Sequence, residues 1–243
     1  MNEKKVLLIF SGGLDSVLSA IRLVFDGYKV LLINFNNGCS LVSGMVYDKA
    51  LELEHIFGKK RIEYLGSTHN VASFRENEVM VANMEFRNIL DNYGDCTISQ
   101  IRCLNCRSAM YFEAIRYCLD NDIKFIAEGA RKSQLFSIEQ PEMIDAYKGL
   151  LKEFGIELIL PVYDVENEWD KECEIYLYGV VPKAGEDKCL LGMPLKEVVP
   201  IEQTMTVKKI FDSHIKPRYI KKLTKRDYPP IRISKEREGI KFD

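Results

Sequence analysis

The sequence predicts an α/β protein with a doubly wound parallel sheet and a small basic appendage at its C-terminal end. Four or five short apolar runs alternate with stretches of helical periodicity, which is the order of a parallel sheet covered by helices. The runs are nearly continuous in apolar residues, as in strands buried on both faces. A chain of 243 residues can form one such domain with appendages. We expect a first domain over residues 1–163 and a C-terminal region over 164–243.

The elements can be placed in order. Apolar runs predict strands at residues 6–10, 29–35, 61–65, 124–127 and 156–162. Helical periodicity predicts helices at 17–25, 46–57, within the polar stretch 74–93, in a stretch ending at Cys118, and at 165–177. Residues 66–70 are expected to form a loop. Pro217 and Pro229-Pro230 argue against one continuous helix in the basic tail.

The composition is that of an ordinary soluble protein, with 47% apolar and 29% charged residues. The apolar run near the N-terminus is too short for a signal peptide, and no segment has the length of a membrane span. We therefore expect a cytoplasmic protein that does not contact membranes. In that compartment the seven cysteines are expected to be thiols, metal ligands or catalytic groups rather than disulfides.

The charge is unevenly distributed along the chain. Residues 207–243 contain twelve Lys and Arg against five Asp and Glu, a net charge of +7, whereas the remainder carries −9. A basic segment on an acidic body favours an anionic partner such as RNA. A solvated helix with a frayed tail would have the same composition, so this alternative stays open.

The stretch Ser11-Gly12-Gly13-Leu14-Asp15-Ser16 lies between the first strand and the first helix. Two glycines allow a tight turn, and the N–H groups and dipole of a helix start favour an anion. Asp15 could hold a Mg²⁺ ion that shields phosphate charge. A Gly-rich turn without ligand is the alternative.

This hexapeptide resembles the PP-loop of the N-type ATP pyrophosphatases, written SGGxDS. The resemblance implies the adenine nucleotide α-hydrolase-like fold and cleavage of ATP between the α- and β-phosphates, which transfers AMP to a substrate oxygen. It implies an ATP-binding set and gives Asp15 a catalytic role. That set consists of Ser11, Gly12, Gly13, Asp15, Ser16, of Asn34, Phe35 and Asn36 after the second strand, and of Gly129 after the fourth.

Cys103 and Cys106 form a CxxC pair near the start of a helix. Such a pair suits Zn²⁺, an iron–sulfur cluster or a redox function. The pair and a lone Cys189 downstream resemble the pattern of the 2-thiocytidine synthetase family of tRNA thiolases. That resemblance implies a [4Fe–4S] cluster held by Cys103, Cys106 and Cys189. The chain differs from the family in having Leu14 in the loop and in having Arg131 and Lys132 where a His and an Asp are usual. Arg107, Arg131 and Lys132 are candidate cationic contacts to phosphate or nucleic acid, and Arg131 and Lys132 are assigned to the catalytic set.

The leading hypothesis is an ATP-dependent sulfurtransferase that adenylylates a carbonyl oxygen, expected on a tRNA base, and replaces it with sulfur. It requires ATP, Mg²⁺ and a sulfur donor; a homodimer is left open. The second hypothesis is an amide- or nitrile-forming enzyme that resembles the 7-cyano-7-deazaguanine synthases, with zinc on four cysteines that include Cys96. The third is a nucleotide- or RNA-binding module without turnover.

Overall fold

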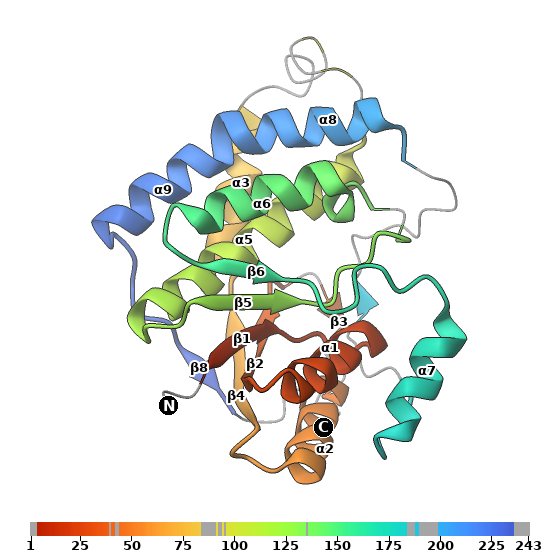
Figure 1. Cartoon of the computed structure of the whole chain (residues 1–243). Coiled ribbons are helices and arrows are strands. Elements are labelled where there is room, and N and C mark those ends of the chain that lie inside the picture. The colour runs from red at the N-terminus through yellow and green to blue at the C-terminus, as the bar shows by residue number, and fades with distance from the viewer. Residues whose placement is uncertain are drawn as a thin grey trace, which may run out of the picture.

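The computed structural model describes residues 4–38, 40–41, 44–83, 91, 94, 96–134, 136–183, 188–189 and 199–235. At its centre lies a six-stranded sheet with the order β6-β5-β1-β2-β4-β8 (Figure 1). Five strands are parallel, and β8 is antiparallel to β4. The strands are β1 (Lys5–Ile9), β2 (Lys29–Asn36), β4 (Ile62–His69), β5 (Phe125–Glu128), β6 (Glu157–Ile159) and β8 (Ile233–Ser234).

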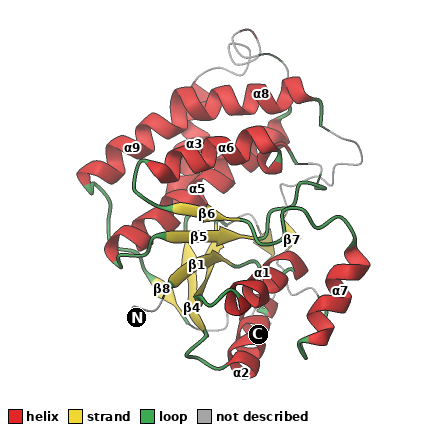
Figure 2. Cartoon of the chain, in the orientation of Figure 1, coloured by secondary structure: helices red, strands yellow, loops and turns green. Residues whose placement is uncertain are grey.

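Helices cover both faces of the sheet (Figure 2). Along β1, Val6 and Leu8 enter one core, whereas Leu7 and Ile9 enter the other, because alternate side chains of a strand point to opposite faces. The first core contains side chains of α1 (Leu14–Phe25), α2 (Met45–Phe57) and α7 (Glu168–Leu177). The second contains side chains of α3 (Val71–Asn83), α5 (Ile98–Asp120), α6 (Pro141–Lys152), α8 (Ile201–Ile210) and α9 (Lys216–Lys225). The predicted doubly wound α/β fold is confirmed.

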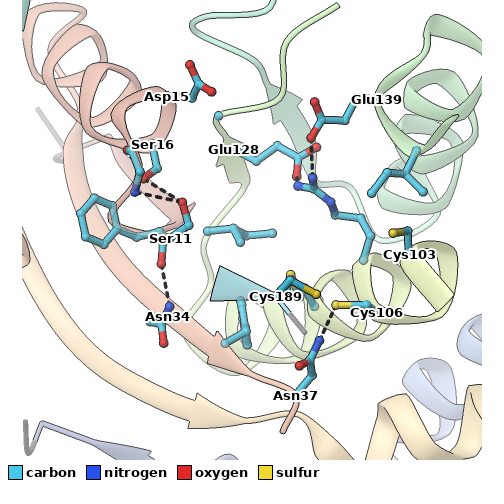
Figure 3. A pocket seen from close by; sticks show the side chains of 18 of the residues that line it. Ser11, Asp15, Ser16, Asn34, Asn37, Cys103, Cys106, Glu128, Glu139 and Cys189 are labelled. Atoms are coloured by element: carbon cyan, nitrogen blue, oxygen red, sulfur yellow. Dashed lines mark hydrogen bonds and ion pairs between the residues drawn. The ribbon is translucent and has the colours of Figure 1, made fainter. Parts of the chain in front are cut away.

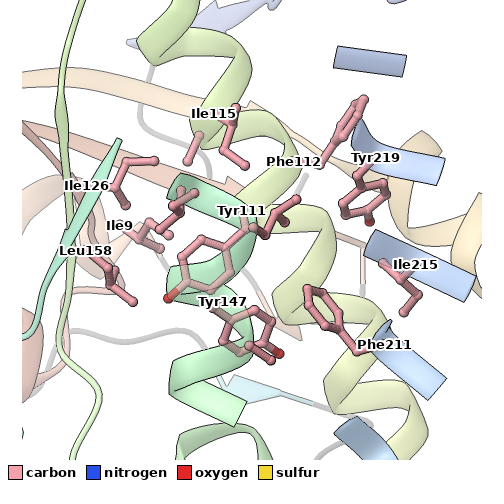
Figure 4. Packing of buried hydrophobic residues seen from close by; sticks show 14 of the residues in the cluster. Ile9, Tyr111, Phe112, Ile115, Ile126, Tyr147, Leu158, Phe211, Ile215 and Tyr219 are labelled. Carbon is pink, nitrogen blue, oxygen red and sulfur yellow. The ribbon is translucent and has the colours of Figure 1, made fainter. Parts of the chain in front are cut away.

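Aromatic side chains join the C-terminal helices to the second core (Figure 4). The ring of Tyr147 on α6 lies 4.6 Å from that of Tyr111 on α5 and 5.1 Å from that of Phe211. Phe112 lies 4.7 Å from Tyr219 on α9, again between ring centroids. Residues 201–225 therefore belong to the same core as α5 and α6. The domain boundary after residue 163 stays a prediction from the sequence.

Helices α8 and α9 follow each other through a π-helical turn, η2 (Phe211–Ile215). Pro217 lies in the first turn of α9, directly after the π-turn, and as a proline it donates no backbone hydrogen bond. Arg226 ends α9 in the left-handed conformation, and Pro229-Pro230 lie beyond it. The helical path therefore continues from Ile201 to Lys225, so Pro217 does not break it, whereas the segment with Pro229-Pro230 is not helical.

The sheet differs from the expectation at β4. Residues 66–69 were expected to form a loop, but β4 extends to His69 because Asn36 of β2 pairs with His69. Ser67 and Thr68 also pair with β8, a strand that the sequence does not predict. Gly66 has φ +127°, and a Cβ there would lie 2.2 Å from the carbonyl oxygen of Ser234. Only glycine allows the two strands to approach so closely.

A second, two-stranded sheet consists of β3 (Ser40–Leu41) and β7 (Lys188–Cys189). Ser40 pairs with Cys189, so the backbone ladder holds Cys189 beside the loop that follows β2. Three parts of the expectations lie outside the described residues: Cys39, residues 84–90 and 92–93 of an expected helix, and the segment 190–194. None of the described helices combines the length and apolar composition that crossing a bilayer requires.

Candidate functional site

The loop after β1 forms one end of a cavity of about 310 Å³ at the carboxyl ends of the parallel strands (Figure 3). Gly12 has φ +76°, and Gly13 is the N-cap of α1 without a side-chain hydrogen bond to the helix. The N–H of Gly13 donates to Ser11 Oγ at 3.2 Å, and Ser16 Oγ donates to the Gly13 carbonyl at 2.9 Å. The turn is therefore held by its own serines. The uncapped start of α1 is a suitable site for an anion.

Gly129, directly after β5, lies against the backbone of this loop. A Cβ at Gly129 would lie 2.7 Å from the carbonyl carbon of Asp15 and 2.8 Å from the backbone nitrogen of Ser16. Real side chains do not come so close to backbone atoms, so residue 129 has to be glycine for the loop to rest on β5. Gly129 also lines the cavity.

Asp15 is surrounded by cationic and amide groups. One carboxylate oxygen, Oδ1, lies 2.9 Å from Arg131 Nε and 2.7 Å from Lys171 Nζ on α7. The other accepts a 3.0 Å hydrogen bond from Gln134 Nε2. Glu168 forms ion pairs with both Arg131 and Lys171. The four charges sum to zero, so without ligand this cluster neutralises itself.

The end of β2 contributes the opposite side of the cavity. Asn34 Nδ2 donates to the Phe10 carbonyl at 3.0 Å, and Asn34 Oδ1 accepts from Ser67 Oγ at 3.2 Å. Its side chain thus joins β1, β2 and β4. Asn36 Oδ1 accepts a 2.8 Å hydrogen bond from the Gly38 N–H. Asn34, Phe35, Asn36 and Asn37 all line the cavity.

The far end of the cavity is lined by Cys103, Cys106 and Cys189. A capping box of Thr97 and Gln100 starts α5 and presents Cys103 and Cys106 one turn apart on one face. Burial raises the pKa of the Cys103 thiol to about 11 and that of Cys106 to about 12. The neighbouring Cys189 raises both pKa values further, and Asn37 Nδ2 donates to Cys106 Sγ.

The donor set fits a group bound by three thiolates, because thiolate is the usual ligand of iron–sulfur clusters and of zinc. Cys96, the fourth ligand of the zinc hypothesis, is instead buried in the hydrophobic core with Ile101 and Leu104 and does not line the cavity. Across the described ranges, no three His, Cys, Asp or Glu side chains are arranged to hold a metal ion. The structure thus brings the three cysteines to one wall without a formed metal centre.

Between the loop and the cysteines lies a cluster of buried charges. Arg107 pairs through one guanidinium nitrogen with Glu128 Oε2 and through the other with Glu139 Oε1 at 2.7 Å. Tyr111 donates to Glu128 Oε1 at 2.6 Å. Burial lowers the pKa of Arg107, but the two carboxylates outweigh burial and raise it. Burial raises the pKa of Glu139 to about 7, although Arg107 opposes this shift.

The predicted site residues are distributed as follows. Those that line the cavity are Ser11, Gly13, Asp15, Ser16, Asn34, Phe35, Asn36, Gly129, Cys103, Cys106 and Cys189. Gly12 shapes the loop without lining the cavity, and Arg131 reaches Asp15 from a buried position. Lys132 is exposed, and its backbone N–H donates to the Tyr163 carbonyl at 2.9 Å. It is the one predicted cation that does not reach the cluster.

Sequence reasoning missed Glu128, Gln134, Glu139 and Lys171. Glu128 directly follows the strand expected at 124–127. This position could have identified it, because the carboxyl ends of strands meet at the ligand-binding edge of an open sheet. Lys171 and Glu139 follow no motif. Lys171 is 156 residues from Asp15 in the chain, and only the packing of α7 on α1 brings the two together.

A 4-thiouridine synthetase solved with RNA and ATP superposes with a TM-score of 0.64 and 13% identity, over 91% of this chain and 51% of that one. The chain shares its fold with that synthetase. The chain thus spans about half the length of that synthetase. The U34-tRNA thiolase NcsA from Methanococcus maripaludis, solved with its [4Fe–4S] cluster, is a weaker match, with a TM-score of 0.44 and 15% identity, over 93% of this chain and 70% of that one.

Sequence comparison of the chain gives one short match. A 62-residue segment is 44% identical to 7-cyano-7-deazaguanine synthase 2 of Sulfurisphaera tokodaii, which is 26% of this chain and 12% of that protein. No family model matches the chain.

Proposed function

We propose that this PP-loop protein is an ATP-dependent sulfurtransferase that forms AMP and pyrophosphate and places sulfur on a carbonyl carbon of an RNA base. The observation that carries the proposal is that the three thiols of Cys103, Cys106 and Cys189 line the same cavity as the SGGLDS loop. A site that activates an oxygen and a site that can supply sulfur are thus parts of one pocket. The 4-thiouridine synthetase with this fold was solved with RNA and ATP, which supports the choice of both ligands.

The phosphates of ATP would bind at the loop. The start of α1 and the hydroxyls of Ser11 and Ser16 supply hydrogen bonds to the α-phosphate. Asp15 is the residue to hold Mg²⁺, since hard carboxylate oxygen is its preferred protein ligand. Once Asp15 turns to the metal, Arg131 and Lys171 keep Glu168 as their carboxylate partner, and the three side chains together carry a net charge of +1 next to the β- and γ-phosphates. They then stabilise pyrophosphate as it leaves.

The reaction has two displacements. The substrate carbonyl oxygen attacks the α-phosphorus, the bond to the β-phosphate breaks, and pyrophosphate carries away the electron pair. A sulfur nucleophile then adds to the activated carbon, and the carbon–oxygen bond breaks with AMP as the leaving group. A cluster on Cys103, Cys106 and Cys189 would supply a site from which sulfur is delivered. The surrounding walls, with Phe35, Met110 and Ile138, limit access of water.

Substitution of Asp15 and of the cysteines tests this proposal. We expect Asp15→Ala to abolish pyrophosphate release without a change in the unfolding temperature. We expect Cys103→Ala, Cys106→Ala and Cys189→Ala each to lose iron, acid-labile sulfide and thiolated nucleoside in protein purified without oxygen. Cys173→Ala, half-buried on α7 outside the cavity, is the matched control. Pyrophosphate release by Asp15→Ala at the wild-type rate would contradict the role of the loop.

A second candidate is an amide- or nitrile-forming enzyme that uses the same adenylate. The 62-residue match to 7-cyano-7-deazaguanine synthase 2 favours it. Its predicted zinc ligand Cys96 lies in the core, which disfavours a four-cysteine site. Metal content separates the two candidates: stoichiometric zinc without sulfide, lost in Cys96→Ala, would establish the second and overturn the first.

A further inference from the structure

One oxygen on the cavity wall has unused capacity to accept a hydrogen bond. Glu128 uses both carboxylate oxygens, one for Tyr111 and one for Arg107. Glu139 uses Oε1 for Arg107 at 2.7 Å, but Oε2 accepts only a 3.4 Å hydrogen bond from the Arg131 N–H. The Glu139 side chain is 6% exposed and lines the cavity. A buried carboxylate oxygen with one long bond is an incomplete receptor for a hydrogen-bond donor.

The sign of the charge around this oxygen limits what can occupy the middle of the cavity. Both outer nitrogens of the Arg107 guanidinium are committed to Glu128 and Glu139. Arg102, the other cation on this wall, lies 3.7 Å from a carboxylate oxygen of Glu78. An anionic acceptor would therefore meet two carboxylates and no uncommitted cation among the described lining residues. A neutral acceptor with an N–H group would complete the hydrogen bonding of Glu139.

The position of Glu139 in the cavity determines which part of a bound substrate its carboxylate can contact. Figure 3 shows Glu139 and Glu128 between Asp15 at one end and the three cysteines at the other. A substrate whose carbonyl lies between the α-phosphate and the thiols therefore presents the atoms beside that carbonyl to Glu139. An N–H directly beside the carbonyl, as at N3 of uracil, is placed to donate to Glu139 Oε2.

We propose that Glu139 determines the specificity of the acceptor, which is a neutral base with a ring N–H beside its reacting carbonyl that donates this N–H to the Glu139 carboxylate. This inference rests on the proposed function, because it takes the cavity to hold a base next to ATP. It goes beyond that function in naming the substrate class and the residue that recognises it. The hydrogen bond to a carboxylate is charge-assisted, and its loss corresponds to about a tenfold loss of affinity or more.

A matched pair of nucleosides tests the inference without turnover. Uridine carries the ring N–H, and 3-methyluridine replaces it with a methyl group. Binding of both is titrated by NMR to full-length protein with a non-hydrolysable ATP analogue present. We expect wild-type protein to prefer uridine by about tenfold or more, and Glu139→Met, which has no acceptor oxygen, to lose that preference. Glu139→Gln keeps an acceptor oxygen and should restore part of it. Glu153→Gln, at an exposed position after α6, is the control and should behave as the wild type.

Equal affinity of the wild type for the two nucleosides would overturn the inference, as would an unchanged preference in a folded Glu139→Met protein. If Glu139→Met does not fold, a Glu139→Gln protein with the same preference as the wild type and no weaker binding of uridine would also overturn it. Pyrophosphate release with RNA is measured in parallel. Its absence in the wild type, together with a retained preference for uridine, would refute the sulfurtransferase while supporting the binding site.

Discussion

Gly129 shows how a residue without a side chain can set the shape of a neighbouring loop. It directly follows β5, and a Cβ on it would lie within 3.0 Å of the backbone of Asp15 and Ser16. That backbone presents the N–H groups and the carboxylate on which the phosphate end of the cavity depends. The space left by the absent Cβ is therefore part of the binding site.

We predict that Gly129→Ala reduces pyrophosphate release at least tenfold. The added methyl group would press on the Asp15 carbonyl carbon at 2.7 Å, so the loop has to shift, at a cost of about 1–3 kcal/mol for overpacking. Steady-state release of pyrophosphate and thermal unfolding measure the two effects. Gly149→Ala on α6 is the control: its Cβ would meet only the flexible end of Lys216 at 3.3 Å, and alanine favours a helix. Equal activity of the two variants would contradict the close approach.

Glu139 also makes stability depend on pH. Its pKa is raised from 4.5 to about 7 in the folded protein, so the folded state binds the proton more tightly than the unfolded chain. This contribution is present in full below pH 4.5 and is lost as the pH rises to about 7. We predict that the free energy of unfolding falls over this window and that Glu139→Gln reduces the fall, by about 1.4 kcal/mol for each unit of pKa shift.

Urea unfolding at pH 5 and pH 7.5 measures that prediction. Glu153→Gln, whose side chain is exposed, should keep the pH dependence of the wild type. If Glu139→Gln and wild type lose the same free energy between the two pH values, Glu139 does not carry the effect.

At the scale of elements, α7 brings Lys171 to Asp15, and it is the helix whose contribution to the site the sequence pattern indicates least. Asn167 caps it, and Arg22 on α1 forms a two-pronged ion pair with Glu174 that fixes it beside the loop. Lys171 therefore reaches Asp15 from a helix that looks merely acidic in the sequence. The buried Lys171 carries the positive charge that α7 places beside Asp15, whereas the acidic residues of α7 pair with cations or face solvent.

The basic C-terminal helix has two faces with different roles. Tyr219 and Leu223 are buried, so deletion of the tail after Pro200 would remove part of the core together with the charge. Substitution of exposed cations is the better test of RNA binding. We predict that the triple variant Lys221→Gln, Lys225→Gln and Arg226→Gln binds RNA more weakly, with a salt slope that is shallower by about two to three.

Filter binding of tRNA across a salt series measures that slope. Lys59→Gln, Lys60→Gln and Arg61→Gln, three exposed cations after α2, form the matched control with the same change of net charge. An equal slope in both triple variants would mean that α9 has no special part in RNA binding.

At the scale of the whole molecule, the sequence predicts features that depend on a few adjacent residues. It does not predict contacts between residues that lie far apart in the chain. Continuous apolar runs identify β1, β2 and β5, and the hexapeptide identifies the loop, because these signals lie within a few adjacent residues. The CxxC pair is visible for the same reason. Lys171 and Glu139 come to the site from separate helices, and β8 is a two-residue strand with no pattern to detect. Cys96 has the same chemistry as Cys103, and only its burial separates them.

The pairing of β8 with β4 has a consequence for the molecule in solution. Without β8, the end of β4 at Ser67 and Thr68 would present unpaired backbone donors and acceptors on an outer strand. Such an edge is a template for another chain. Arg116 holds the segment leading to β8 through the Pro229 carbonyl, and its guanidinium lies 4.6 Å from the Tyr228 ring centroid. The last described strand thus covers this edge against pairing with another chain, and a protease cut between α9 and β8 would allow β8 to leave and expose the backbone groups of β4.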